Sequence, residues 1–318
     1  MLLPSAPELV RTDSFPPCAA VLPFLSASTF QTWFADLQTE RFAQKAYAIR
    51  QRLAHADQRW EDAFFITLAR NFGFGRAGDR FEAWAARLPF RAIDKHRDSL
   101  FQIEAFFFGT AGLLEGRPAG AGDYYYQLRK EFHYLQRKFE LREVTDAPWD
   151  AAQLRAGGYP HVRLAQLAHL YYKEQALFSR AMEAESLEEV KALFVVTTSP
   201  YWETHTIFGK PSPKIGKSLG GNALNLLVIN TVVPFLYAYA LYKGSEALCE
   251  RATRFLESLP AENNHIIRLW RAATPLPITS AAHSQAVLQL QKAYCDPRNC
   301  LACRFGTEYL RLQEEHPA

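Results

Sequence analysis

Apolar side chains recur with the period of an α-helix along most of this chain, and this recurrence restricts the fold more than any other feature. Each such segment carries apolar residues at i, i+3, i+4 and i+7, which places them on one face of a helix. The clearest stripes lie in residues 30–53, 65–72, 125–139 and 164–171, and further helices are expected at 98–114, 223–242, 245–258 and 283–294. Because a helix must bury its apolar stripe against other elements, these helices should pack around a common core.

Little of the sequence is left for β-strands, and the best candidate is the segment LFVVTT at residues 193–198. No segment repeats at a fixed period, which argues against a regular solenoid. The sequence therefore predicts a mainly α protein, an irregular multi-helix domain with at most a minor β element.

Several helix boundaries can be read from capping residues. Ser28 and Gln31 predict a capping box at the start of the first long helix. Gly73 should end the helix that contains residues 65–72, because glycine is the preferred residue just beyond a helix. Ser186 and Glu189 predict the start of a further helix.

The first residues differ in composition from the rest of the chain. Residues 1–27 contain five prolines and little periodicity, which is typical of extended backbone. We therefore expect an extended arm at residues 1–27 and a single helical domain at 28–318.

Composition and charge exclude several classes of protein without indicating an activity. The 318 residues are 48% hydrophobic and 22% charged, which is ordinary for a folded soluble chain. A net charge of +3 is too small to indicate nucleic-acid binding by itself. The first residues lack the basic and apolar regions of a signal peptide, so we expect a cytoplasmic location.

One uncharged stretch, between Lys217 and Lys243, is long enough to span a bilayer. It contains Asn222, Asn225 and Asn230, whose amides would be costly to place in hydrocarbon. We interpret this stretch as a buried core helix and expect no membrane association.

The sharpest local motif is C-x4-C-x2-C near the carboxyl end, formed by Cys295, Cys300 and Cys303. Three thiolates within nine residues can converge on one soft ion, and the spacing favours zinc or an iron–sulfur cluster. A closed site needs a fourth ligand, for which Cys18, Cys249 and His283 are the candidates.

The alternative interpretation is that these cysteines are ordinary small apolar side chains in a loop and helix. Five cysteines without a secretory signal favour reduced thiols or metal ligands over disulfides.

A second feature is a loop that carries Lys210, Lys214 and Lys217. Residues 204–245 contain no Asp or Glu, and the loop is rich in Gly, Pro and Ser. Such a loop ahead of a helix could contact phosphate or a nucleic-acid backbone, although isolated basic loops are also common solvated surfaces. The triplet GKS at 216–218 lacks the first glycine of a P-loop and a preceding strand, so we do not expect nucleotide binding of that kind.

Signals for catalysis are weak. Glu203 and His205 would share one side of an extended segment and could serve acid–base chemistry. Glu104 lies in an otherwise apolar helix, so it must be paired or have a raised pKa, and pairing with an arginine such as Arg163 is the simpler expectation. We therefore lean against an enzymatic activity for this chain alone.

Several segments, taken in order, resemble the bacterial family known as domain of unknown function 2851. They are WEDAFFITLARNFGF at 60–74, LFQIEAFFFGTAGLL at 100–114, YPHVRLAQLAHL at 159–170, YWETHTIFGKPS at 201–212, INTVVPFLYAY at 229–239 and YCDPRNCLACRFG at 294–306. The resemblance extends over nearly the whole chain, but it implies no activity and no functional residues.

The resemblance carries two further expectations. Longer members of the family have an additional amino-terminal region that resembles a nuclease core, so this chain looks like the helical carboxyl-terminal portion of that design without the nuclease-like region. Family members also have a cysteine in the PPC segment, which favours Cys18 as the fourth ligand beside Cys295, Cys300 and Cys303.

We expect, on this basis, a non-catalytic helical accessory domain for nucleic-acid binding or for a nuclease partner. In this interpretation Lys210, Lys214 and Lys217 contact phosphate, and the cysteines hold a structural zinc ion or iron–sulfur cluster. The alternative is a helical protein-interaction scaffold that does not bind nucleic acid.

Overall fold

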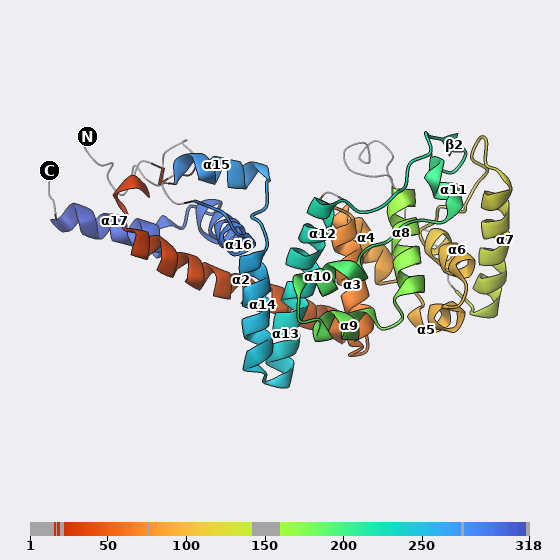
Figure 1. The fold of residues 1–318 in the computed structure, drawn as a ribbon, viewed down its shortest axis with the longest axis horizontal. Coiled ribbons are helices and arrows are strands. Elements are labelled where there is room, and N and C mark those ends of the chain that lie inside the picture. The colour runs from red at the N-terminus through yellow and green to blue at the C-terminus, as the bar shows by residue number, and fades with distance from the viewer. Residues whose placement is uncertain are drawn as a thin grey trace. The chain divides into compact units, whose positions relative to one another are not determined.

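The structure is a computed structural model that describes Pro16, Cys18, Ala19 and residues 22–75, 77–141, 160–274 and 277–315. Helices dominate this part of the chain, so the predicted mainly α class with a minor β element is confirmed (Figure 1). Most of the expected arm at 1–27 lies outside the described residues.

The chain divides into two compact units, which are described separately: residues 1–48 with 236–318, and residues 49–235. The single helical domain expected at 28–318 is therefore presented in two parts. The first unit contains η1 (Leu22–Phe24), most of α2 (Ala27–His55), the end of α13 (Val233–Lys243), α14 (Glu246–Ser258), α15 (His265–Ala273), α16 (Ala281–Leu290), η4 (Gln291–Cys295), η5 (Cys300–Ala302) and α17 (Arg304–Glu315).

The second unit carries the remaining elements. They are the end of α2, α3 (Trp60–Phe72), α4 (Gly78–Ala85), α5 (Phe90–Ile93), η2 (Asp94–His96), α6 (Leu100–Thr110), α7 (Asp123–Lys138), α8 (Pro160–Lys173), α9 (Leu177–Glu183), α10 (Leu187–Leu193), α11 (Pro200–Glu203), β1 (His205–Ile207), β2 (Lys210–Pro211), α12 (Gly221–Leu227), η3 (Val228–Val232) and the start of α13. Within this unit α3 packs against α4, and α6 packs against both α7 and α8 (Figure 1).

The core of the second unit is built largely from aromatic rings. Phe65 and Trp84 both pack on Phe107, with ring centroids 5.6 and 5.1 Å away. Phe107 itself is fully buried. Such edge-on aromatic pairs add to the stabilisation that burial alone supplies, which explains why α6 can be almost wholly apolar.

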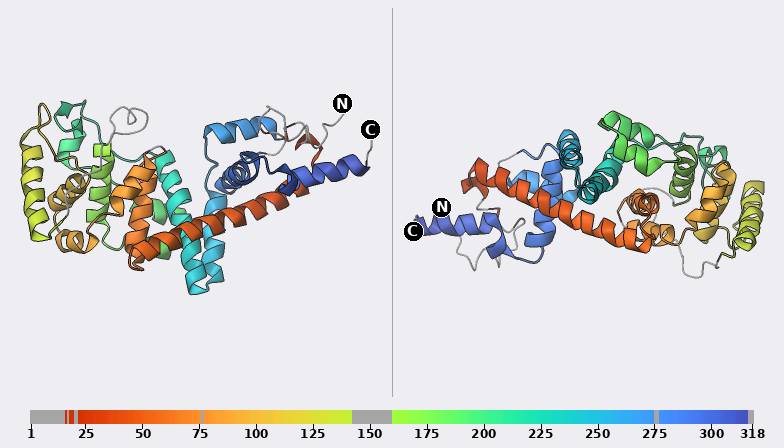
Figure 2. Two further views of the ribbon diagram at one scale, coloured as in Figure 1. Left: turned by 180° about the vertical axis from the view of Figure 1, so that it is seen from behind. Right: turned by 90° about the horizontal axis from the view of Figure 1, so that it is seen from below.

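The core of the first unit joins the beginning of α2 to the carboxyl-terminal helices. Phe30 on α2 packs against Phe305 on α17 with ring centroids 4.7 Å apart. Both views in Figure 2 show the start of α2 (red) close to α17 (dark blue). Leu37, Trp270 and Leu290 belong to the same buried cluster. The periodic apolar stripe predicted for residues 30–53 therefore points into a core, as its spacing required.

The predicted strand at 193–198 is wrong. α10 ends at Leu193, and residues 195–199 form no regular secondary structure. Val195 is 57% exposed, and its carbonyl accepts a hydrogen bond from Lys173. The sheet in the described residues is instead the short antiparallel pair of β1 and β2.

Two of the three helix ends predicted from capping residues are confirmed, and one is wrong. Gly73 caps α3, and the Ser186 side chain accepts from the Glu189 amide at the start of α10, as expected. The capping box at Ser28 is wrong, because α2 begins at Ala27 and the Ser26 hydroxyl accepts from the Thr29 amide instead.

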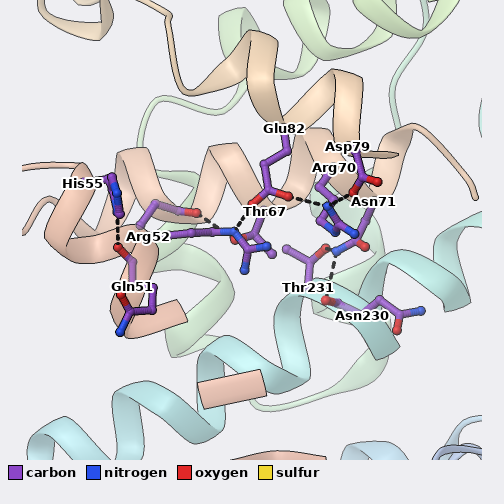
Figure 3. A network of polar contacts seen from close by, with 11 residues as sticks. Gln51, Arg52, His55, Thr67, Arg70, Asn71, Asp79, Glu82, Asn230 and Thr231 are labelled. Carbon is purple, nitrogen blue, oxygen red and sulfur yellow. Dashed lines mark hydrogen bonds and ion pairs between the residues drawn. The ribbon is translucent and has the colours of Figure 1, made fainter. Parts of the chain in front are cut away.

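The apolar stretch Gly221–Lys243 runs from α12 to α13. Among the described helices it alone is long and apolar enough to cross a membrane, judged by length and composition. However, 61% of its most apolar part is buried inside the protein. Its middle, η3, is a π-helical turn. There the Asn71 side chain donates to the Asn230 carbonyl at 2.9 Å and to the Thr231 hydroxyl at 2.8 Å (Figure 3). These contacts satisfy polar groups that would be costly in hydrocarbon.

Candidate functional site

The four cysteines proposed as ligands lie at the ends of short elements in the first unit. Cys18 is in a turn before η1, Cys295 ends η4, Cys300 begins η5, and Cys303 immediately precedes α17. A cavity of about 20 Å³ is lined by all four side chains, together with Leu290, Tyr294 and Gly306.

Local backbone geometry brings the trio of carboxyl-terminal cysteines together. Arg298 adopts a left-handed conformation with φ of 56°, and its amide donates to the Cys295 carbonyl, so the chain reverses after η4. A Cβ atom on Gly306 would lie 2.0 Å from the Cys300 carbonyl oxygen. Glycine is therefore needed there for α17 to start beside η5.

The cavity has room for about one water-sized atom. Cys303 is 6% exposed and belongs to the core of the unit, and Cys18 and Cys295 pack against that core. All five cysteines of the chain are free thiols. Across the described residues, no three His, Cys, Asp or Glu side chains are arranged to hold a metal ion as they stand.

The environment of these thiols favours their protonated form. Burial, followed by repulsion from Cys303 and Cys300, raises the pKa of Cys18 to about 12. Burial and the neighbouring cysteines also raise the pKa of Cys295. A cation that binds here would have to displace these protons, because only thiolates are strong metal ligands.

The other two candidates for a fourth ligand lie elsewhere. Cys249 is on α14 and His283 is on α16, and neither lines the cysteine cavity. The His283 ring packs on Phe34 with centroids 6.0 Å apart. Cys18, which the family resemblance favoured, is the cysteine that shares the cavity with the trio.

The lysine loop leaves the β1–β2 hairpin in the second unit. Lys210 lies on β2 and is exposed, and Lys214 is 77% exposed at its side chain with its ammonium group 3.7 Å from Glu203. Lys217 is half-buried, and its carbonyl accepts from Gln166 at 2.7 Å. Two of the three lysines are thus open to solvent.

A second loop, residues 115–122, lies directly against this hairpin. A Cβ atom on Gly209 would lie 2.3 Å from the Ala119 carbonyl oxygen, and one on Gly120 would lie 2.9 Å from the Gly209 carbonyl. Both glycines also have positive φ values. Their close approach brings the loop that carries exposed Arg117 beside the lysine hairpin.

Half-buried aromatic rings line the base of these loops. Tyr201 stacks on Tyr124 at 4.4 Å and on His205 at 4.0 Å between ring centroids. The Tyr201 hydroxyl accepts from the Gly209 amide. The segment 201–205 is a short helix followed by β1, so the extended arrangement expected for Glu203 and His205 is wrong.

Glu104 lies behind this stack and is 1% exposed. Tyr124 donates a short hydrogen bond to it, whereas Arg163 donates to Gln166. The expected pairing of Glu104 with Arg163 is replaced by a hydroxyl partner, and burial raises the pKa of Glu104 to about 7.

Sequence reasoning missed several buried polar groups near Glu104. Within the described ranges, four buried atoms of this region have no hydrogen-bond partner: Glu104 Oε1, His161 Nδ1, Thr198 Oγ1 and Trp202 Nε1. The His161 and Trp202 ring centroids lie 5.9 Å apart. Only Glu104 gave a signal in the sequence, because it interrupts an apolar helix.

The three groups weighed for acid–base chemistry have separate partners. Glu104 bonds Tyr124, Glu203 faces Lys214, and His205 stacks on Tyr201. This arrangement gives no support to a shared catalytic centre.

Comparisons with known proteins give one finding. No curated protein and no solved structure matches this chain. A family model described as "Protein of unknown function (DUF2851)" matches residues 1–265. That match includes Cys18 and the lysine loop, but it ends before Cys295, so the segment 294–306 lies beyond it. Because the match covers most of the sequence, the chain belongs to the DUF2851 family.

Proposed function

We propose that this chain is a non-catalytic helical accessory domain that binds the nucleic-acid backbone, in support of a nuclease partner. Lys210, Lys214 and Lys217 are the proposed phosphate contacts. The observation that carries the proposal is the packing of the 115–122 loop against the lysine hairpin through Gly120 and Gly209. The lysine loop and the loop that carries exposed Arg117, which are distant in the sequence, thereby form one surface.

The surroundings of this surface fit single-stranded nucleic acid best. Half-buried Tyr124, Tyr201 and His205 lie at the base of these loops, and aromatic rings next to cationic side chains are typical of such interfaces. The contact between Lys214 and Glu203 joins two solvent-exposed groups and is worth at most about 1 kcal/mol. It leaves Lys214 available to a phosphate group.

The test is the anisotropy of a fluorescent oligothymidylate of about 20 nucleotides. Three phosphate contacts predict that affinity falls about 20-fold when salt rises from about 50 to about 200 mM. The triple variant K210A/K214A/K217A should bind at least tenfold more weakly at low salt and lose most of this salt dependence. The control K191A/K243A/K292A removes the same charge elsewhere and should bind normally. No binding at low salt, or equal binding by both triple variants, would overturn the proposal.

We further propose that Cys18, Cys295, Cys300 and Cys303 hold a structural metal ion that ties the chain before α2 to the start of α17. Two facts support this: the four thiols share one cavity, and four cysteines are a typical zinc donor set. The volume of about 20 Å³ suits a single zinc ion better than an iron–sulfur cluster. When bound, the ion would supply cross-linking and no catalysis.

Elemental analysis of anaerobically purified protein tests the metal directly. We expect one zinc per chain in the wild type and in Cys249→Ser, and little in Cys303→Ser or Cys18→Ser. A visible absorption band with bound iron would instead indicate the cluster. Metal-free native protein whose four thiols are all alkylated would exclude both.

A protein-interaction scaffold is the second candidate function. Leu241 and Tyr242, at the end of α13, are 52% and 68% exposed. Neighbouring exposed apolar side chains are typical of protein contact sites. A partner that still binds the K210A/K214A/K217A variant would favour this function. Under both proposals the protein works in the cytoplasm and without a membrane.

A further inference from the structure

The second unit contains an open cavity of about 390 Å³, and none of the candidate site residues that the sequence singled out lines it. It lies between the turn that joins α2 to α3, the α5 segment and the end of α7. Ile66, Leu88, Phe90 and Phe139 supply its apolar walls. Small-molecule sites typically have volumes of about 300–1,000 Å³ and walls of this kind.

Two of the residues that line this cavity, Arg59 and Asp62, belong to a polar network. Arg59 contacts Asp62 on one side and Asp94 on the other, each at 3.2 Å. The Tyr171 hydroxyl donates to Asp94 at 2.6 Å. Because Arg59 contacts two carboxylates, its charge is already neutralised.

The rim of the cavity, in contrast, carries cations with weak partners. Arg91 is 81% exposed at its side chain, and its guanidinium lies 4.0 Å from the Asp57 carboxylate. Exposed Lys95 lies 5.9 Å above the ring of Phe139. An ion pair at 4.0 Å between two exposed side chains contributes little, so both cations remain available.

These observations define what the cavity can recognise. The network around Arg59 has no positive charge to spare, because two carboxylates contact that guanidinium. Among the other side chains that line the cavity, Arg91 and Lys95 outnumber Asp57 by one charge, so this part of the site favours one negative charge. The cations are at the rim and the apolar side chains form the walls. A bound molecule would therefore place an anionic group at the mouth and an apolar body inside.

We infer that this cavity binds a small organic acid with an apolar body, whose carboxylate is held by Arg91 and Lys95. Leu88, Phe90 and Phe139 cover the apolar part. This site is independent of the nucleic-acid surface and of the cysteine cavity, and it gives the chain a small-molecule ligand.

Calorimetric titration with octanoate tests the inference. Two further probes separate the contributions, because acetate lacks the long alkyl chain and 1-octanol lacks the negative charge. Each buried methylene is worth about 0.8 kcal/mol, so octanoate should bind at least tenfold more tightly than acetate. It should also bind about tenfold more tightly than 1-octanol. The double variant R91A/K95A should lose about tenfold in octanoate affinity and none in 1-octanol affinity.

The matched control is R50A/K130A, which removes two exposed cations of the same unit that do not line the cavity. It should bind octanoate as the wild type does. Octanoate that binds no better than acetate, or equally well to R91A/K95A and to the wild type, would overturn the inference. Both substituted side chains are exposed, so neither variant should disturb folding.

Discussion

Two carboxylates of the second unit, half-buried Glu82 and fully buried Glu104, have pKa values that their surroundings shift in opposite directions. Glu82 on α4 lies between two arginines, with the Arg52 guanidinium at 2.6 Å and Arg70 also bonded to it (Figure 3). Glu104 on α6 has the Tyr124 hydroxyl as its hydrogen-bond donor.

The pKa values differ accordingly. Burial pushes the pKa of Glu82 up, but the hydrogen bonds and charges of Arg52 and Arg70 outweigh it, so the net pKa is lowered. Burial raises the pKa of Glu104 to about 7, and the hydrogen bond from Tyr124 offsets only part of this effect. A hydroxyl donor therefore does not replace a cation as the partner of a buried carboxylate.

The largest expected effect is the pH dependence that Glu104 imposes on stability. Its folded pKa of about 7 exceeds the ordinary value of 4.5, so its stabilising contribution is complete below pH 4.5 and is lost as pH rises through 7. Between about pH 5 and pH 8 this loss should reach about 2–3 kcal/mol. Urea unfolding of the wild type and of Glu104→Gln at both pH values measures it.

The Gln variant keeps the shape of the side chain and removes the titration. The free energy of unfolding of the Gln variant, relative to that of the wild type, should increase as pH rises, and the variant should be the more stable protein at pH 8. If the difference in free energy of unfolding between the two proteins is the same at both pH values, Glu104 has an ordinary pKa and the contrast with Glu82 disappears.

The sequence was a good guide to the fold wherever a signal was local. Gly73 and Ser186 end and begin helices through contacts within a few residues. The prediction of a strand at 193–198 failed because a run of apolar and β-branched residues forms a strand only when a second strand is available to pair with it. In the part of the chain that the structure describes, no strand pairs with it.

The candidate sites were predictable to different degrees. The spacing of Cys295, Cys300 and Cys303 is visible in the sequence because the three lie within one short segment. The approach of Gly120 to Gly209, and the cavity beside Arg91, depend on residues that are distant in the sequence. Their assembly is a property of packing, which periodicity does not reveal.

The second effect concerns Glu82, whose contribution to stability should depend on pH in the opposite direction to that of Glu104. Glu82→Gln leaves Arg52 and Arg70 partly buried without their carboxylate, which should cost about 2 kcal/mol at neutral pH. Because the folded pKa is lowered, this contribution is present above pH 4.5 and is lost as pH falls below it. Urea unfolding at pH 7 and about pH 3 should show the cost shrinking in acid, whereas exposed Glu115→Gln should change stability by less than about 0.5 kcal/mol.

The smallest effect isolates the hydroxyl donor itself. Tyr124→Phe removes the hydrogen bond that lowers the pKa of Glu104, so that pKa should rise further. The loss of stability should be about 1 kcal/mol above pH 7, where the carboxylate form needs the donor, and less at pH 5. Exposed Tyr126→Phe serves as the control and should leave the pH profile unchanged. A Tyr124→Phe profile that superimposes on that of the wild type would mean that the hydroxyl contributes nothing to the charge state of Glu104, and burial alone would then account for its difference from Glu82.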